Sequence, residues 1–207
     1  MRLATMRVTF AHGLWSSTES SKAAWMREQG WEVVTLDMRT YGWDIANQTK
    51  VVLEAIDQQG PFDLLIGSSF GGLATANAAA QRPELALRLL LLAPAFGYPD
   101  LVKETLGEEA MASWESSGVH VFHPPGWDEA VNMPWSFYEV AHDHAWPALP
   151  HPTALLHGAQ DDVVPLANSE RAVEQHPHVH LEIVSDGHRL HGSLPHLVPL
   201  AASLLNA

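Results

Sequence analysis

The 207-residue chain has no cysteine and few basic residues. Without cysteine, it has no disulfide framework, no thiolate nucleophile and no thiolate metal site. Eleven Lys and Arg stand against 24 Asp and Glu, which gives a formal net charge of −13. A protein that binds a polyanion needs clustered cations. The composition therefore predicts no nucleic-acid partner.

Long hydrophobic runs are also missing. No apolar stretch approaches the roughly 20 residues that a membrane-spanning helix requires. The first residues of the sequence show neither a long apolar segment nor the small-residue cleavage site of a signal peptide. We therefore expect no membrane span and a cytoplasmic location. A hydrophobic content of 46% over this length fits one filled core, so we expect a single domain over residues 1–207.

Short apolar segments alternate with helical patterns through most of the chain. The expected strands are 7–11, 31–36, 62–66, 88–93, 153–156 and 179–184. The expected helices are 16–30, 45–59, 73–81, 166–175 and 197–205. This alternation predicts an α/β fold with a mostly parallel sheet of about six strands flanked by helices.

The alternation is interrupted between residues 98 and 150, after the fourth expected strand. A helix is expected over 101–117 and a strand over 119–122, followed by an aromatic-rich stretch. Such an insertion is typical of a lid over a site, although a surface excursion that packs its own core is the alternative. We hypothesise that four of its side chains wall an apolar substrate pocket: Met111, Trp114, Trp135 and Phe137.

The sequence Gly67-Ser68-Ser69-Phe70-Gly71 lies between the third expected strand and an Ala-rich helix. A Gly-x-Ser-x-Gly pattern in this context predicts a nucleophile elbow, a sharp turn that exposes the serine oxygen at the end of the sheet. The glycines allow the close backbone approach that the turn requires. Only Ser69 fits as the nucleophile, because Ile66 stands two residues before Ser68.

A serine nucleophile needs a base and a group that orients the base. His188 follows the last expected strand and is the predicted base, ahead of His191 and His196, which lie in or near the terminal helix. The loop after strand 153–156 offers Asp161 and Asp162 as the acid, and the local chemistry does not separate them.

An oxyanion hole is expected to combine the backbone N–H of Phe70 with one from the loop after the first strand. That loop is His12-Gly13-Leu14-Trp15, so Leu14 is the predicted second donor and Trp15 is predicted to face the acyl pocket. Gly13 in a simple strand-end turn is the alternative interpretation.

Two histidine-rich stretches, His176-x-His178-x-His180 and His142-Asp143-His144, suggest a metal site. Pro177 disturbs the regular strand geometry of the first, and tracts of this kind have low specificity. We therefore interpret them as surface histidines and expect no metal and no cofactor.

In chain order, these motifs resemble serine hydrolases of the α/β-hydrolase fold. The resemblance is carried by the strand end at His12, the Gly67–Gly72 elbow, His157-Gly158-x-x-Asp161-Asp162-Val163-Val164-Pro165 and Ser185-Asp186-Gly187-His188-Arg189. Within the fold, the chain looks most similar to the group of the mitochondrial palmitoyl-protein thioesterase that also hydrolyses acyl glucuronides, and to short bacterial YqiA-like esterases. The resemblance implies Asp161 as the acid, four residues after His157, and His188 as the base.

The predicted function is therefore hydrolysis of a carboxylic ester or acyl thioester through an acyl-enzyme, with a small-molecule acyl ester or thioester as the substrate. The alternative is a non-catalytic small-molecule binding protein on the same fold, because a fold alone does not give a function. The acyl length and the oligomeric state stay open.

Overall fold

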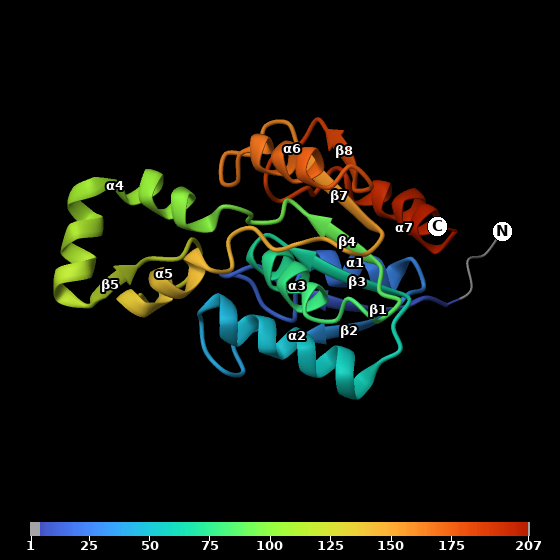
Figure 1. Cartoon of the computed structure of the whole chain (residues 1–207), viewed down its shortest axis with the longest axis horizontal. Helices are drawn as coiled ribbons and strands as arrows, with labels where there is room; N and C mark the ends of the chain where they lie inside the picture. Colours follow the sequence, from blue (N-terminus) through green and yellow to red (C-terminus); the bar gives the residue numbers. More distant parts are fainter. Residues whose placement is uncertain (1–4, 207) are drawn as a thin grey trace.

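Six parallel strands form the central sheet of the computed structural model, which describes residues 5–206 (Figure 1). The strands are β1 Arg7–Ala11, β2 Glu32–Leu36, β3 Leu64–Ser68, β4 Leu89–Leu92, β7 Thr153–Gly158 and β8 His180–Val184. Their order across the sheet is β2-β1-β3-β4-β7-β8, and every neighbouring pair is parallel. The predicted α/β fold and the count of about six strands are confirmed.

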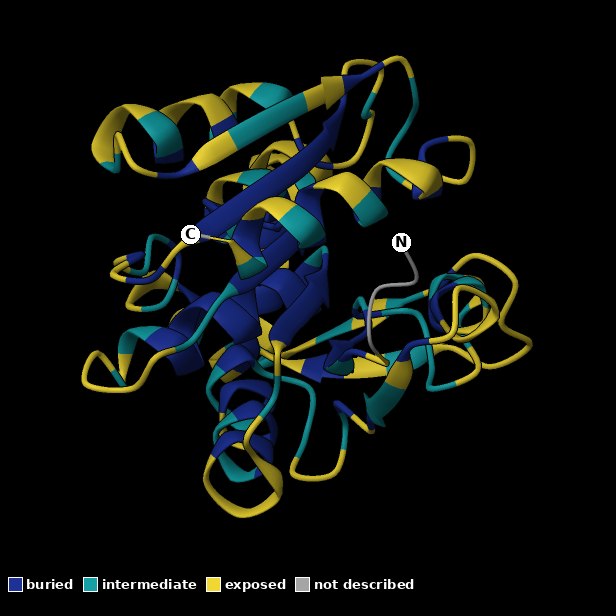
Figure 2. Ribbon diagram, turned by 90° about the vertical axis from the view of Figure 1, so that its right-hand side faces the viewer, coloured by how far each residue is buried: buried dark blue, intermediate teal, exposed yellow. Residues whose placement is uncertain are grey.

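Helices cover both faces of this sheet. Helices α1 Ser21–Glu28 and α7 Leu197–Leu205 cover one face, and α2 Ile45–Gln59, α3 Phe70–Ala80 and α6 Leu166–Gln175 cover the other. Successive strand residues point to opposite faces, so Leu64 and Ile66 pack toward α1 and α7 while Leu65 packs toward α2 and α3. The inner strands β1, β3, β4 and β7 are therefore buried on both sides, as Figure 2 shows by their dark blue colour, whereas the edge strands β2 and β8 are partly exposed.

The strand order reverses between β1 and β3. The chain runs from β1 outward to β2, then returns past β1 to β3 and continues in the opposite direction. In open parallel sheets, ligands bind at the carboxyl ends of the strands beside such a reversal. The residues after β1 and β3 are the ones in which the sequence predicts the oxyanion loop and the elbow.

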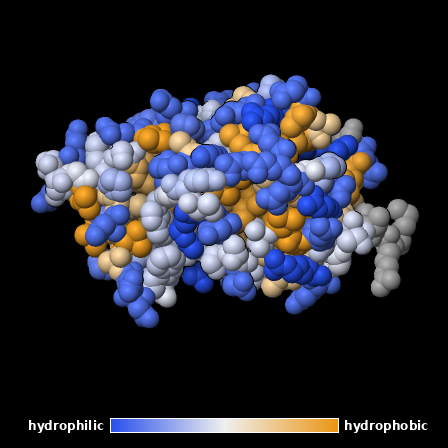
Figure 3. Space-filling view, turned by 90° about the horizontal axis from the view of Figure 1, so that it is seen from below, coloured by the Kyte–Doolittle hydropathy of each residue, from blue (hydrophilic) through white to orange (hydrophobic). Residues whose placement is uncertain are grey.

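The segment between β4 and β7 projects beyond the carboxyl ends of the strands, at the left of Figure 1. It consists of α4 Tyr98–Ser117, the antiparallel hairpin of β5 Val119–Phe122 and β6 Val131–Pro134, and α5 Trp135–His142. We call this segment, with the loop that leads to β7, the lid. Val119 and Val121 of β5 are exposed, and Figure 3 shows hydrophobic surface at this end of the molecule.

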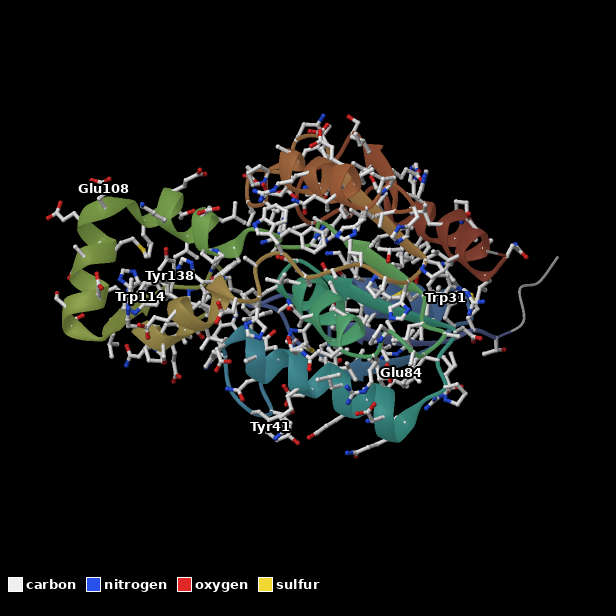
Figure 4. All side chains as sticks on the ribbon, viewed as in Figure 1. Trp31, Tyr41, Glu84, Glu108, Trp114 and Tyr138 are labelled. Carbon is white, nitrogen blue, oxygen red and sulfur yellow. The ribbon has the colours of Figure 1, made fainter. Side chains whose placement is uncertain are left out.

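Trp114 is the centre of the lid. Its side chain is fully buried, and its indole N–H donates to the Met133 carbonyl at 2.9 Å. The rings of Trp135 and Tyr138 lie 5.5 and 6.0 Å from it, and Figure 4 shows Trp114 and Tyr138 together between α4 and α5. The lid therefore has an aromatic core of its own.

Several element boundaries differ from the sequence prediction. Helix α1 begins at Ser21 rather than at residue 16, because Ser20 is the residue whose hydroxyl accepts a hydrogen bond from the Lys22 N–H and caps the helix. Helix α4 starts at Tyr98 and is interrupted at Gly107, where φ is 76°. The strand β6 and the helix α5 were not predicted. Within the described residues, no helix is long and apolar enough to cross a bilayer.

Candidate active site

Ser69 lies on a strained turn between β3 and α3. Its backbone φ is 54° and its ψ is −120°, a conformation that residues other than glycine rarely adopt. The glycines on either side have no space for a side chain. A Cβ on Gly67 would lie 2.5 Å from the Gly71 carbonyl oxygen, and a Cβ on Gly71 would lie 2.3 Å from that of Ala11. The predicted elbow geometry is therefore present.

Three side chains from separate loops form a continuous hydrogen-bonded chain. His188 Nε2 lies 3.0 Å from Ser69 Oγ, and His188 Nδ1 lies 2.8 Å from Asp161 Oδ2. The Asp161 side chain is fully buried, whereas His188 is 19% exposed and can therefore meet a ligand. Asp162, the other candidate acid, is exposed, and so are His191 and His196. The structure thus brings the three predicted residues together.

Asp161 is held by donors on both carboxylate oxygens. Its Oδ1 accepts the backbone N–H groups of Val163 at 2.9 Å and Val164 at 2.8 Å. Its Oδ2, which faces His188, also lies 3.2 Å from Nε2 of His157. Burial by itself would raise the pKa of Asp161, but hydrogen bonds from His157, His188 and the Val164 N–H outweigh it and hold that pKa below its usual value. Asp161 is therefore an ionised, fixed acceptor.

His157 is a site residue to which the sequence analysis assigned no role. Its ring is fully buried, its Nε2–H is directed at the Val164 carbonyl at 3.0 Å, and its Nδ1 lies 2.7 Å from Ser169 Oγ. It therefore helps to hold the turn that carries Asp161 in place. Its position four residues before Asp161 was visible in the sequence, but its burial was not.

The loop that carries His188 is fixed by Asp186. One oxygen of this carboxylate accepts the Gly187 N–H at 2.8 Å, and the other accepts the Gly192 N–H at 2.9 Å and the Ser193 hydroxyl at 3.0 Å. The loop lies directly against the strand end of β7, since a Cβ on Gly158 would be 2.3 Å from the Asp186 carbonyl oxygen. This close approach sets the distance between His188 and Asp161.

The turn after β1 lies beside the serine. A Cβ on Gly13 would be 3.4 Å from Ser69 Cβ and 3.9 Å from Ser69 Oγ. Among the described residues, neither the Leu14 N–H nor the Phe70 N–H donates a hydrogen bond. His12, at the end of β1, is buried, which lowers its pKa, and its Nδ1 lies 2.9 Å from the Gly13 carbonyl oxygen. Two backbone N–H groups without a described acceptor are thus found in the turn after β1 and at the residue after Ser69.

The five predicted pocket residues lie in three places. Phe137 is buried against Phe70, with ring centroids 5.8 Å apart, so the lid reaches the elbow there. Met111 and Trp114 are buried within the lid, with Trp135 packed against them, and Trp15 contacts an aromatic group at the other side of the lid. The Tyr98 ring packs against Phe137, and burial of the Tyr98 phenol raises its pKa.

An open cavity lies away from these residues. Its volume is about 580 Å³, and it lies between α4, Trp146 and α6, with Arg171 stacked 4.0 Å from the Trp146 ring. None of the five predicted pocket residues lines it. Over residues 5–206, no group of three or more His, Asp or Glu side chains is arranged to hold a metal ion.

Comparison with known proteins assigns the chain to a family. The chain belongs to the uncharacterised protein family UPF0227. The match spans residues 7–204. Among curated proteins, this family member is 32% identical over 149 residues to the mitochondrial palmitoyl-protein thioesterase ABHD10 of Pongo abelii, and 31% identical over 149 residues to that of Homo sapiens. Each match covers 69% of this chain and 48% of the relative, so the chain spans about half the length of the curated relatives it matches.

Solved structures share the fold at lower identity. Alpha/beta hydrolase domain-containing protein 10 from mouse superposes with a TM-score of 0.81 at 23% identity, covering 98% of this chain and 90% of that one. Est1E from Butyrivibrio proteoclasticus with bound ferulic acid superposes with a TM-score of 0.73 at 20% identity, covering 100% of this chain and 90% of that one. These comparisons confirm the predicted α/β-hydrolase fold and the resemblance to the thioesterase and YqiA-like groups.

Proposed function

We propose that this UPF0227 member is a serine hydrolase that cleaves carboxylic esters or acyl thioesters through an acyl-enzyme. The observation that carries the proposal is the hydrogen-bonded chain from Ser69 Oγ to His188 at 3.0 Å and from His188 to Asp161 at 2.8 Å. The strained φ of Ser69 supports it, since such strain is found where a side chain is held for chemistry.

In the first step, Ser69 Oγ attacks the acyl carbonyl carbon while His188 Nε2 takes the hydroxyl proton. The carbonyl oxygen becomes an oxyanion, which accepts hydrogen bonds from the N–H groups of Leu14 and Phe70. The intermediate then collapses: the bond to the alcohol or thiol breaks, and His188 returns the proton to the leaving group. Asp161 keeps the His188 ring oriented and stabilises the imidazolium during both transfers.

Water then attacks the acyl-enzyme by the same route in reverse. His188 takes a proton from the water as the water oxygen attacks the acyl carbon. The tetrahedral intermediate then collapses: the ester bond to Ser69 breaks, His188 returns the proton to Ser69 Oγ, and the carboxylic acid leaves. Esters and thioesters pass through the same kind of tetrahedral intermediate, so one machinery serves both. The relatives named as a palmitoyl-protein thioesterase and the structure of Est1E with bound ferulic acid support acyl substrates of this class. The contact of Phe137 with Phe70 supports an apolar lining next to Ser69.

The proposal is tested with p-nitrophenyl esters from acetate to palmitate and with palmitoyl-coenzyme A, using wild type, Ser69→Ala and Ser68→Ala. We expect wild-type turnover that falls by about three orders of magnitude or more in Ser69→Ala, as triad deletions do. Ser68→Ala removes the adjacent hydroxyl and is the matched control, expected to keep turnover within a few-fold of wild type. Wild type without turnover on every substrate, together with ligand binding that survives in Ser69→Ala, would favour the binding-protein alternative instead.

A further inference from the structure

Leu14 lies in the turn Gly13–Ser16, and all four carbonyl groups of this turn accept hydrogen bonds. The Gly13 carbonyl accepts the Ser16 N–H at 3.0 Å, which closes the turn. The Leu14 and Ser16 carbonyls both accept hydrogen bonds from the Arg39 guanidinium, at 3.3 and 2.7 Å. The Trp15 carbonyl accepts the indole N–H of Trp127 at 3.2 Å. The acceptors of the turn are thus engaged, while the Leu14 N–H donates to no described residue.

Arg39 itself is fixed between two aromatic rings. Its guanidinium carbon lies 5.2 Å from the Trp43 ring and 5.4 Å from the Trp127 ring, both within the range of a cation–π contact. The side chain is half-buried and makes no salt bridge to a described carboxylate. Its two donors therefore serve the turn rather than an acidic partner. A planar guanidinium that binds two carbonyls through Nη1 while it lies near the Trp43 and Trp127 rings is a role that lysine does not reproduce.

Trp127 brings the lid into the same contact. It lies in the connection between β5 and β6, 112 residues from Trp15 along the chain. The Trp15 ring lies 5.6 Å from Trp43, 5.8 Å from Phe122 and 6.3 Å from Trp127. The turn after β1, the loop after β2 and the lid hairpin therefore meet in one aromatic group, with Arg39 inside it.

We propose that Arg39 and Trp127 are positioning residues that hold the Gly13–Ser16 turn so that the Leu14 N–H faces the developing oxyanion. This inference rests on the proposed function. Backbone donors stabilise a transition state only when they are already oriented, because reorientation during the reaction costs free energy. Glycine makes this turn flexible by itself. Hydrogen bonds from Arg39 and Trp127 to three carbonyls restrict this flexibility, and Trp127 belongs to the lid. The docked position of the lid therefore completes the oxyanion hole.

The experiment compares Arg39→Lys and Trp127→Phe with matched controls at remote sites. Arg39→Lys keeps the charge but loses the planar guanidinium, and Trp127→Phe keeps an aromatic ring but loses the N–H. Arg27→Lys and Trp25→Phe make the same changes on α1, which packs on the opposite face of the sheet from the lid. For each protein, kcat and KM are measured on the best p-nitrophenyl ester, with active sites counted by fluorophosphonate titration. The inhibition constant of an alkyl trifluoromethyl ketone, which forms a tetrahedral oxyanion on serine, is measured in parallel.

We expect kcat per active site to fall by about 10- to 100-fold in Arg39→Lys, since a displacement of about 1 Å can cost 100-fold. In Trp127→Phe, kcat per active site is expected to fall by about 3- to 10-fold, because this variant loses one of the three anchoring hydrogen bonds. KM should change by less than about 3-fold, while trifluoromethyl ketone binding should weaken by the same factor as kcat/KM, because both depend on the oxyanion contact. The two controls should match wild type. A role in folding alone would lower the active-site count but leave kcat per site unchanged.

The outcomes separate the two proposals. Wild-type turnover with unaltered kcat per site and unaltered ketone binding in both variants would overturn the positioning role and leave the hydrolase proposal standing. Wild type with no turnover and no fluorophosphonate labelling would overturn the proposed function, and the positioning role with it.

Discussion

Replacing Gly71 by alanine sets two opposing effects against each other. Gly71 is in the first turn of α3, and alanine in a helix is favoured over glycine by about 1 kcal/mol. The new Cβ, however, would lie 2.3 Å from the Ala11 carbonyl oxygen and 2.4 Å from that of His12. These are backbone atoms at the end of β1, which cannot swing away as a side chain would. Overpacking of a filled site costs about 1–3 kcal/mol, and because the contacts are this short and involve backbone atoms, we expect the cost for Gly71→Ala at the upper end of that range.

The net expectation is a loss of about 2 kcal/mol in the free energy of unfolding, with the steric cost exceeding the gain in helix propensity. For a chain of this length, that lowers Tm by about 4–8 °C. The assay is urea unfolding followed by circular dichroism, supported by calorimetry. Gly187→Ala is the control, because its Cβ would have no neighbour closer than the Gln160 carbonyl oxygen at 3.6 Å. We expect that control to stay within about 1 kcal/mol of wild type. A Gly71→Ala protein as stable as wild type would refute the crowding argument for the elbow.

Three further predictions concern the acid, its support and the lid. The pKa of Asp161 is lower in the folded state than the value of about 3.9 in an unfolded chain. Its ionised carboxylate therefore stabilises the fold at pH values above about 3.9, and this stabilisation is lost as the pH falls toward the pKa of the folded state. The free energy of unfolding should therefore fall more steeply between pH 5 and pH 3, measured by urea unfolding, in wild type than in Asp161→Asn; equal slopes would contradict this assignment. His157→Leu keeps a similar side-chain volume but removes the ring nitrogen that lies 3.2 Å from Asp161 Oδ2. We expect the free energy of unfolding, measured in urea, to fall by about 1–3 kcal/mol, and kcat to fall at unchanged KM. Unchanged stability and kcat would rule out the supporting role. Trp114→Ala empties a fully buried site and should cost about 3–5 kcal/mol. If that variant keeps the wild-type preference for acyl chain length, Trp114 belongs to the lid core alone and its predicted pocket role is wrong.

The sheet and the elbow were predictable because their signals are local. Short apolar runs such as 62–66 end at glycine, and a helix-forming stretch follows at once, so strand, turn and helix are each marked by adjacent residues. The parallel order and the reversal beside β1 then follow from chain topology. Ser69 and His188 could be singled out for the same reason: Ser69 directly follows β3, and His188 lies in the loop after β8.

The remaining features depend on contacts between distant residues. Ser16, Ser17, Thr18 and Ser20 are all suitable helix caps, and only packing selects Ser20. The strand β6 and the helix α5 are adjacent and short, with Pro134 at their junction, so neither shows a clear period. Asp161 could not be separated from Asp162 by local chemistry, because the difference is burial and the two backbone N–H groups that Asp161 accepts.

Arg39 was missed for a related reason. A single arginine in a polar loop carries no motif, and its partners Leu14, Ser16 and Trp127 lie 25, 23 and 88 positions away in the sequence. Only the fold brings the turn, the guanidinium and the lid tryptophan together. The contacts that shape the candidate site are thus less visible in the sequence than Ser69 and His188 themselves.

The most direct test of the account is the identity of the nucleophile. Wild type, Ser69→Ala and Ser68→Ala are incubated with an alkyl fluorophosphonate, which loses fluoride as it phosphonylates an activated serine, and are then analysed by intact mass and peptide mapping. The account predicts one adduct on Ser69 in wild type and in Ser68→Ala, and none in Ser69→Ala. An adduct on any other residue, or labelling of Ser69→Ala at the wild-type rate, would contradict it.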